Sequence, residues 1–177
     1  MMRTSKNLLL LLLCALMLAA CGFQLRGSVD LPFTSLAIAL PDANAFRAKL
    51  VRNIAAGSKT LLVGSPREAQ ATLGFTEDST VKNVLSLNSA GKVREYQLVR
   101  TLGFRLYDNL GRDLIPPGKI VVRRDITFDD SQVLSKASEE GLLIRDMEDD
   151  LVQQILRRLA ASKPEFPVDK AEPVKKG

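Results

Sequence analysis

Three consecutive stretches between residues 71 and 128 alternate apolar and polar side chains with period two. The residues that share the apolar parity are Ala71, Leu73, Phe75, Val81, Leu85 and Leu87 in the first stretch, Tyr96, Leu98, Leu102, Phe104 and Leu106 in the second, and Ile120, Val122, Ile126 and Phe128 in the third. Because successive side chains of a strand point to opposite faces, each stretch predicts a strand with one buried face. Turn-forming residues at 88–91 and 108–111 separate the stretches, which predicts an antiparallel meander of three long strands. Residues 116–118, Pro-Pro-Gly, are expected at a strand start, a bulge or an edge.

The segments on either side of the meander predict a second layer. Residues 35–40, Ser-Leu-Ala-Ile-Ala-Leu, indicate a buried N-terminal strand, and a helix capped by Asp42 or Asn44 is expected to follow it to about Ala56. Residues 138–162 predict a longer helix whose apolar side chains step by four: Leu143, Met147, Leu151, Ile155 and Leu159. The predicted fold class is therefore an α+β two-layer sandwich, with a mainly antiparallel sheet, made of the meander plus the N-terminal strand, and two helices on one face.

The N-terminus has the pattern of a bacterial lipoprotein leader. Arg3 and Lys6 precede an uncharged apolar run that ends at Leu18 and is shorter than the ~20 residues that span a bilayer. Leu-Ala-Ala-Cys at 18–21 resembles the lipobox, in which the cysteine receives a diacylglyceryl thioether and, after cleavage, an N-acyl chain. We therefore predict a signal peptide at 1–20 and a lipidated Cys21, since two or more acyl chains anchor a protein stably. An ordinary signal peptide or a core helix is the alternative.

The remaining chain is expected to form one domain at 21–162 followed by a disordered tail at 163–177, which is rich in Pro, Lys, Glu and Asp and has no period. Its first residues, 22–26, alternate apolar and polar side chains and are consistent with a short strand. Without Arg3 and Lys6 the chain has 23 bases and 20 acids, a net charge of +3. Such a mild excess suits anionic head groups and does not indicate a nucleic-acid partner.

The composition argues against an enzyme. The chain has no His, and its two Cys are Cys14, in the leader, and Cys21, so the folded domain has no thiol, disulfide or imidazole. No phosphate-binding or nucleophile-elbow motif is present, and we expect no catalytic residue, metal site or cofactor. The acidic run at 146–150 is interpreted as a solvated helix face.

Two arginines have the parity of the buried side chains on their strands. A buried charge is costly unless it is paired, and Arg100 and Arg124 therefore need partners. Glu148 lies within the apolar arc of the last helix, and Glu77 shares the buried parity of the first stretch. We predict that at least one of the two arginines reaches Glu148 or Glu77. The alternative is that both side chains extend past the sheet edge with only their stems covered.

Several segments in order resemble the LPS-assembly lipoprotein family LptE. They are residues 21–26 (Cys-Gly-Phe-Gln-Leu-Arg), residues 95–98 (Glu-Tyr-Gln-Leu), the stretch 124–136 from Arg124 through Phe128-Asp129 to Lys136, and the final amphipathic helix. The similarity covers roughly 21–160. It implies a non-enzymatic protein on the periplasmic face of the outer membrane that forms a one-to-one complex with the β-barrel LptD. In that complex it would act as plug and assembly scaffold and bind lipopolysaccharide; Gly22 after the acylated cysteine, rather than Asp, agrees with sorting to the outer membrane.

The implied ligand directs attention to three cations. Lys92 and Arg94 follow the first predicted turn, and Lys136 is expected on the loop before the last helix. Ammonium and guanidinium groups form charge-assisted hydrogen bonds to phosphate, so these residues are candidate lipopolysaccharide-binding residues. A solvated hairpin end is the alternative.

Three other functions remain open at this stage: a free lipid-carrier lipoprotein, a scaffold lipoprotein of another barrel-assembly machine, and an envelope hydrolase that uses two carboxylates. A carrier needs a large apolar cavity, and the few aromatic residues leave little to line one. A sugar hydrolase would lack the usual aromatic platforms, because the chain has no Trp.

Overall fold

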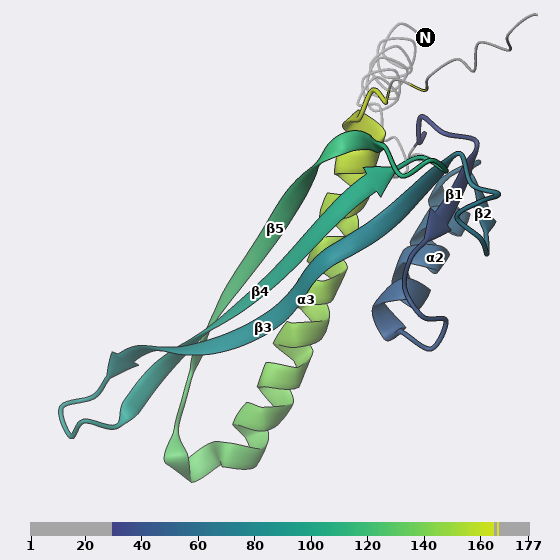
Figure 1. Ribbon diagram of the computed structural model, residues 1–177. Helices are drawn as coiled ribbons and strands as arrows, with labels where there is room; N and C mark the ends of the chain where they lie inside the picture. Colours follow the sequence, from purple (N-terminus) through teal and green to yellow (C-terminus); the bar gives the residue numbers. More distant parts are fainter. Residues whose placement is uncertain (1–29, 165, 167–177) are drawn as a thin grey trace, which may run out of the picture.

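The computed structural model describes residues 30–164 and 166 and contains a five-stranded sheet covered by two helices (Figure 1). The strands are β1 (Ser35–Ile38), β2 (Leu61–Val63), β3 (Ala71–Leu87), β4 (Val93–Tyr107) and β5 (Asp113–Thr127). The helices are α2 (Ala45–Gly57), the short 3-10 helix η1 (Asp130–Gln132) and α3 (Val133–Ala161). The predicted leader, the lipidation site Cys21, the predicted strand at 22–26 and most of the predicted tail lie outside the described residues.

The predicted fold class is confirmed. Strands β3, β4 and β5 form the antiparallel meander, and α3 runs along their length, while β1, β2 and α2 lie together at one end (Figure 1). The sheet is mixed, because β1 pairs in parallel with both β2 and β3, and its order is β2-β1-β3-β4-β5. Parallel neighbours need a crossover, which α2 provides between β1 and β2.

The same local chemistry closes both turns of the meander. The side chain of Asn88 accepts hydrogen bonds from the backbone N–H groups of Ala90 and Lys92, each at 3.0 Å. Asp108 does the same for Leu110 and Arg112, each at 2.9 Å. Gly91 and Gly111 have φ values of +73° and +81°, a backbone conformation that side chains with a Cβ disfavour. The predicted turn sequences therefore fix the two hairpins.

A β-bulge in β3 changes which face its residues occupy. The register shifts between Phe75 and Glu77, so Leu73 pairs with Leu106 on the helix side whereas Val81 pairs with Val99 on the open side. The prediction that Val81 shares a buried face with Leu73 is therefore wrong, and Val81 is 49% exposed. A period-two pattern carries no sign of an inserted residue, because the bulge reverses the parity without changing the composition.

One apolar core joins the two helices to one face of the sheet. The buried helix residues are Phe46, Leu50 and Ile54 of α2 and Met147, Leu151, Val152, Ile155, Leu156 and Leu159 of α3. Asn44 rather than Asp42 caps α2, accepting a hydrogen bond from the N–H of Arg47 at 3.0 Å. Among the described residues, no helix has both the length and the apolar character needed to cross a membrane.

Helix α3 begins five residues earlier than the sequence predicts. Asp129 caps η1 by accepting hydrogen bonds from the N–H and the hydroxyl of Ser131, at 2.9 and 2.8 Å, and α3 continues directly from η1. Lys136 therefore lies in the first turns of a helix and not on a loop. The prediction for the Pro-Pro-Gly segment is confirmed, because β5 is an edge strand and its register against β4 shifts between Ile115 and Gly118.

Candidate functional site

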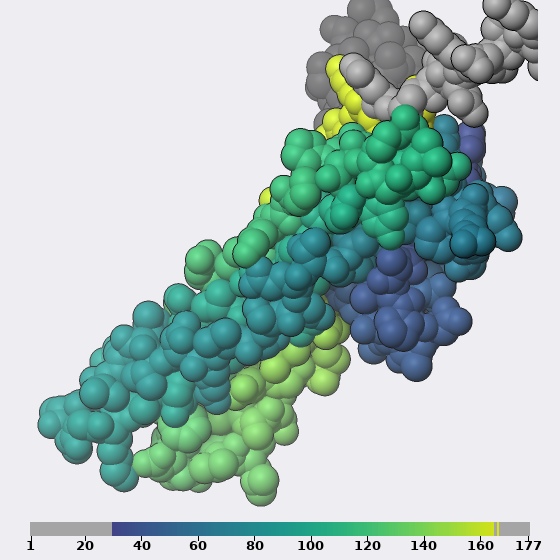
Figure 2. All heavy atoms as spheres, in the orientation of Figure 1, coloured from purple at the N-terminus to yellow at the C-terminus, as the bar shows by residue number. Residues whose placement is uncertain are grey.

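The three cations chosen from the sequence lie at one end of the molecule. This hairpin end consists of the β3–β4 turn, the last residues of β5, η1 and the start of α3. Figure 2 shows the teal hairpin tip and the green start of α3 next to each other at this end. Lys92 and Arg94 project from the hairpin, with side chains 67% and 65% exposed, whereas Lys136 on α3 is only 18% exposed.

Two pockets open at the hairpin end. The larger, of about 450 Å³, lies between the hairpin and η1, and its lining residues are Asn88, Lys92, Val93, Arg94, Phe128, Asp129, Asp130 and Ser131. The smaller, of about 140 Å³, lies between the sheet and α3, and its lining residues are Lys82, Tyr96, Ile126, Phe128, Val133, Lys136, Ala137 and Glu140. The structure thus brings Lys92 and Arg94 into one pocket and Lys136 into its neighbour, with Phe128 shared between them.

Phe128 lines both pockets, and Tyr96 packs against it on the side of the smaller one. Tyr96 and Phe128 pack edge to face, with ring centroids 5.4 Å apart and an interplanar angle of 80°. The ammonium group of Lys82 lies 4.3 Å from the centroid of Tyr96, within the range of a cation–π interaction. The smaller pocket therefore combines an apolar wall with two ammonium groups, those of Lys82 and Lys136.

Each of the four cations already has a carboxylate partner. The ion pairs and their N···O distances are Lys92–Asp130 at 3.0 Å, Arg94–Glu95 at 3.5 Å, Lys136–Glu139 at 2.8 Å and Lys82–Glu140 at 2.6 Å. Lys136 also donates to the hydroxyl of Thr127 at 3.0 Å. Exposed ion pairs contribute at most about 1 kcal/mol, so an anion with more charge than a carboxylate can displace these partners.

Hydrogen bonds keep two acids of this end ionised. The Ser86 hydroxyl donates to Glu95 at 2.5 Å and, together with the charge of Arg94, lowers the pKa of Glu95 below its usual value. The backbone N–H and the hydroxyl of Ser131 lower the pKa of Asp129, with a smaller contribution from the charge of Lys136. Glu95 and Asp129 therefore remain ionised at neutral pH.

Exposed apolar side chains surround these charges. At the end of β3 they are Val84, Leu85 and Leu87, which are 55%, 48% and 57% exposed. At the start of α3 they are Val133 and Leu134, which are 53% and 85% exposed. The hairpin end is thus amphipathic, with cations, two pockets and apolar side chains within one region.

The two arginines with buried parity have different partners. The guanidinium of Arg100 lies 3.0 Å from Asp78 and 3.8 Å from Glu148, and its side chain is 13% exposed. Its Nε atom is buried and makes no hydrogen bond within the described residues. Arg124 pairs instead with Asp146, at 3.0 Å, and with Asp150, two acids one helical turn apart on α3.

Two sequence-based assignments are corrected here. Glu77 does not share the buried face, because the bulge turns it to the open side of the sheet, where it pairs with Lys119 at 2.5 Å. Asp146 and Asp150 are more than a solvated acidic face, since they attach α3 to β5 through Arg124. In the part of the chain that the structure describes, no group of three His, Cys, Asp or Glu residues could hold a metal ion.

Sequence reasoning also missed Lys82. The bulge brings Lys82 to the helix side of the sheet, where it meets Glu140 and Tyr96. A positive residue within an alternating strand gives no sign of this role. Lys82 pairs with Leu98, a buried residue of β4, and only this strand pairing places its side chain on the helix side of the sheet.

Similar folds occur in solved structures of bacterial lipoproteins. An uncharacterized lipoprotein B from Nitrosomonas europaea is 35% identical, with a TM-score of 0.69, over 79% of this chain and 91% of the other. A minor lipoprotein from Acinetobacter baumannii is 26% identical, with a TM-score of 0.62, over 74% of this chain and 93% of the other.

Sequence comparisons agree with the structural ones. The LPS-assembly lipoprotein LptE of Pectobacterium atrosepticum is 29% identical over 156 residues, which are 85% of this chain and 83% of that protein. Its namesake in Yersinia enterocolitica is also 29% identical, over 163 residues, 89% of this chain and 77% of that protein. The family model described as LptE, lipopolysaccharide-assembly, matches residues 33–159, which include all strands and both long helices except the last residues of α3. The chain therefore belongs to the LptE family.

Proposed function

We propose that this chain is a non-enzymatic outer-membrane lipoprotein that forms a one-to-one complex with the LptD β-barrel. After removal of residues 1–20 it is acylated at Cys21, and its single domain at 21–162 lies on the periplasmic face. Within the complex it is plug and assembly scaffold, and it binds lipopolysaccharide for insertion into the outer leaflet. The observation that carries this proposal is the family match over residues 33–159.

The hairpin end supports the choice of ligand. Lipopolysaccharide is an amphiphile with phosphate groups, and this end places cations beside pockets and exposed apolar side chains. Phosphates accept strong hydrogen bonds from ammonium and guanidinium groups. Lys92 and Arg94 are the candidates for the larger pocket, and Lys136, now joined by Lys82, for the smaller one.

A free lipid carrier is the first alternative function. Such a carrier needs an apolar cavity between its layers, but packed side chains of both helices and the sheet fill that space here. A scaffold for another barrel-assembly machine is the second alternative, and only the identity of the partner separates it from the proposal.

The partner is tested by purifying the mature lipoprotein in gentle detergent and identifying the co-purifying molecules by mass spectrometry. We expect one large barrel, LptD, at equal stoichiometry. Recovery of lipid without any barrel would favour the carrier, and recovery of a different barrel would favour the second alternative.

The ligand site is tested separately by binding of lipopolysaccharide at physiological salt. The triple variant Lys92→Ala, Arg94→Ala, Lys136→Ala is expected to bind about tenfold more weakly or worse, because a hydrogen bond to a charged group contributes about 1.5–3 kcal/mol. The matched control removes three exposed cations away from the hairpin end: Arg52, Arg67 and Lys163. Equal affinity of the two triple variants would refute the proposed site.

A further inference from the structure

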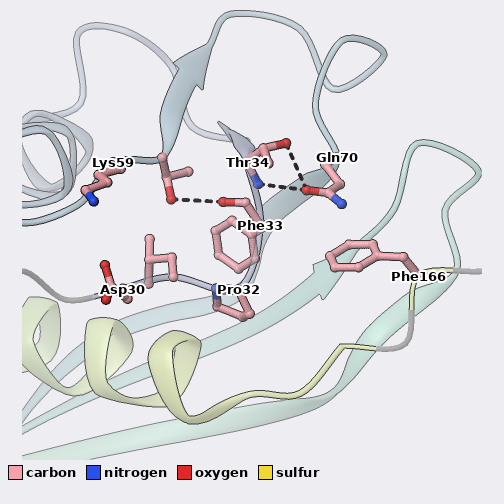
Figure 3. Close-up of a pocket in the computed structure, with 9 residues that line it drawn as sticks. Asp30, Pro32, Phe33, Thr34, Lys59, Gln70 and Phe166 are labelled. Atoms are coloured by element: carbon pink, nitrogen blue, oxygen red, sulfur yellow. Dashed lines mark hydrogen bonds between the residues drawn. The ribbon is translucent and has the colours of Figure 1, made fainter.

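A third pocket lies at the opposite end of the molecule, beside the first described residue of the chain (Figure 3). It has a volume of about 430 Å³, and its lining residues are Asp30, Leu31, Pro32, Phe33, Thr34, Lys59, Thr60, Gln70 and Phe166. These residues come from the segment before β1, the loops before β2 and β3, and the segment after α3. Figure 3 shows the rings of Phe33 and Phe166 on two sides of this pocket.

Hydrogen bonds hold the walls of this pocket in place. The Thr60 hydroxyl donates to the carbonyl of Phe33 at 3.0 Å, and Thr60 is buried. The side-chain oxygen of Gln70 accepts from the backbone N–H and the hydroxyl of Thr34, at 2.7 and 3.1 Å. The pocket is therefore a formed feature of the fold and not a gap between unconnected loops.

Several polar groups at the rim of the pocket are available for further hydrogen bonds or ion pairs. Within the described residues, the carboxylate of Asp30, the ammonium of Lys59 and the side-chain N–H groups of Gln70 make no hydrogen bond or ion pair. The apolar part of the lining comes from Leu31, Phe33 and Phe166, and because Phe33 is only 3% exposed, Leu31 and Phe166 present most of it. A segment that alternates apolar and polar side chains would satisfy both parts of this surface.

Such a segment lies directly before the pocket in the sequence. Residues 22–26 read Gly-Phe-Gln-Leu-Arg, so Phe23 and Leu25 share one side in an extended conformation while Gln24 and Arg26 share the other. Only residues 27–29, Gly-Ser-Val, separate Arg26 from Asp30. Gly and Ser favour a turn, which would return the segment over the pocket.

We propose that the mature N-terminal segment, residues 22–26, binds in this pocket. Phe23 and Leu25 face Leu31 and Phe166, and Arg26 supplies the positive charge that complements Asp30. The docked segment covers apolar surface that the family resemblance and the proposed complex leave unexplained.

This docking sets the distance between the acylation site and the folded domain. Eight residues lie between Cys21 and Asp30, and the nine extended steps that join them reach about 30 Å. The pocket lies at the end of the molecule that carries α2, β1 and β2 (Figure 1), so binding of residues 22–26 there keeps Cys21 close to this end. The acyl anchor then holds this end at the membrane and directs the hairpin end away from it. The contact itself depends neither on LptD nor on lipopolysaccharide, so it can fail while the proposed function stands.

Tryptophan fluorescence tests the docking, because the chain contains no Trp. Phe166→Trp in the mature lipoprotein introduces a single reporter in the pocket wall. In this background, Phe23→Ser with Leu25→Ser is expected to shift the emission to longer wavelength and to increase quenching by acrylamide, because water reaches the indole. The matched control is Gln24→Ser with Arg26→Lys, which changes the polar side of the same segment but keeps the positive charge at position 26, and it is expected to leave the emission wavelength nearly unchanged.

Each other result overturns the proposal, and two of them identify a different occupant of the pocket. An equal shift or no shift in both pairs would show that the apolar side of the segment does not cover the pocket. A shift caused only by deleting residues 167–177 would assign the pocket to the tail, and a shift that depends on protein concentration would assign it to a second copy of the chain. As a second measurement, Leu25→Cys with Lys59→Cys should form an intramolecular disulfide in higher yield than Gln24→Cys with Lys59→Cys, and equal yields would contradict the docking.

Discussion

The space between the sheet and α3 differs sharply between the two ends of the helix. From Met147 onward, α3 contributes six buried apolar side chains to a core that also contains α2 and the adjacent parts of the sheet. Before Met147 none of its side chains is fully buried: Leu143 and Ile144 pack partly buried against the core, and ion pairs provide the polar links to the sheet. These pairs are Lys82–Glu140, Arg124–Asp146 and, at the boundary, Arg100–Glu148. We call the first region the apolar half and the second the ionic half.

We therefore expect the apolar half to supply most of the stability of the fold and the ionic half to open more easily. Burial of apolar area is the main favourable term in folding, whereas partly exposed ion pairs contribute little. Local opening therefore requires less free energy in the ionic half than in the apolar half. The candidate site lies in the ionic half, where the hairpin and the start of α3 can separate while the apolar half stays folded.

The largest expected effect is a cavity in the apolar half. Leu151 is fully buried, and Leu151→Ala is expected to lower the free energy of unfolding by about 2–5 kcal/mol, through lost burial and the cavity left behind. Urea denaturation followed by circular dichroism measures this change. Leu142 on the same helix is 61% exposed, and Leu142→Ala should change stability by less than about 0.5 kcal/mol. Similar losses for both variants would remove the distinction between the halves.

The β-bulge at the boundary gives the next largest effect. A Cβ at Gly103 would lie 2.4 Å from the hydroxyl of Thr76 and 3.0 Å from the Cβ of Glu77. Gly103→Ala is therefore expected to cost about 1–3 kcal/mol, as overpacking does, and to reduce hydrogen-exchange protection in β3 beyond the bulge. Gly57 has no neighbour within 4 Å, so Gly57→Ala is the control without a clash. An unchanged stability in Gly103→Ala would show that the strands around the bulge can move apart to admit the Cβ without cost.

Removing the positive charge of Arg100, at the boundary between the two halves, is expected to change the free energy of unfolding less. Arg100→Met leaves Asp78 and Glu148 without this partner, and we expect a loss of about 1–2 kcal/mol, below the cost of breaking a fully buried pair because Asp78 is 46% exposed. A double-mutant cycle with Glu148→Gln isolates the coupling between the two residues. Full additivity of the two substitutions would show that the 3.8 Å contact contributes nothing.

The apolar half and the ionic half were not equally predictable from the sequence. The apolar stripe of α3 and the residues Phe46, Leu50 and Ile54 of α2 were predicted as a core, because their helical spacing leaves one arrangement that buries them all. The bulge at Thr76 was not predicted, because a single inserted residue leaves no mark on composition or turn chemistry. The assignments of Glu77 and Val81, which follow the bulge on β3, therefore took the wrong face.

Only part of the candidate site could be predicted, because contacts between residues far apart in the sequence leave no local pattern. Lys92, Arg94 and Lys136 were chosen by charge and by a family resemblance, and the structure places them at one end of the molecule. The partners of Arg94 and Lys136 are local in sequence, Glu95 and Glu139, but the partner of Lys92, Asp130, lies 38 residues away. Local sequence patterns do not report pairs of this kind, because they depend on how η1 and α3 return to the hairpin.

Alkaline pH tests the link between α2 and α3 at the boundary. Burial lowers the pKa of Lys49, but hydrogen bonds and charge attraction from Asp149 and Glu148, at 2.8 and 3.2 Å, outweigh it and raise the pKa above 10.5. A raised folded-state pKa means that this stabilisation is complete below the pKa of the unfolded chain and is lost as pH rises through the folded-state value. The stability difference between the natural protein and Lys49→Met should therefore be constant up to about pH 10 and then shrink. A difference that grows above pH 10 would contradict this sign.

The smallest expected effect lies deepest in the ionic half, at the pair formed by Lys82 and Glu140. Both side chains are about one-third exposed, at 36% and 27%, so a double-mutant cycle with Lys82→Met and Glu140→Gln should give a coupling of only about 0.5 kcal/mol at low salt and less at high salt. The single variant Lys82→Met should lose slightly more than the cycle assigns, because it also removes the cation–π contact with Tyr96. Urea denaturation at two salt concentrations measures both quantities. A coupling above about 2 kcal/mol, independent of salt, would show that this end is as tightly held as a buried pair. The hairpin and α3 would then be fixed against each other, and a phosphate could not readily replace Glu140 beside Lys82.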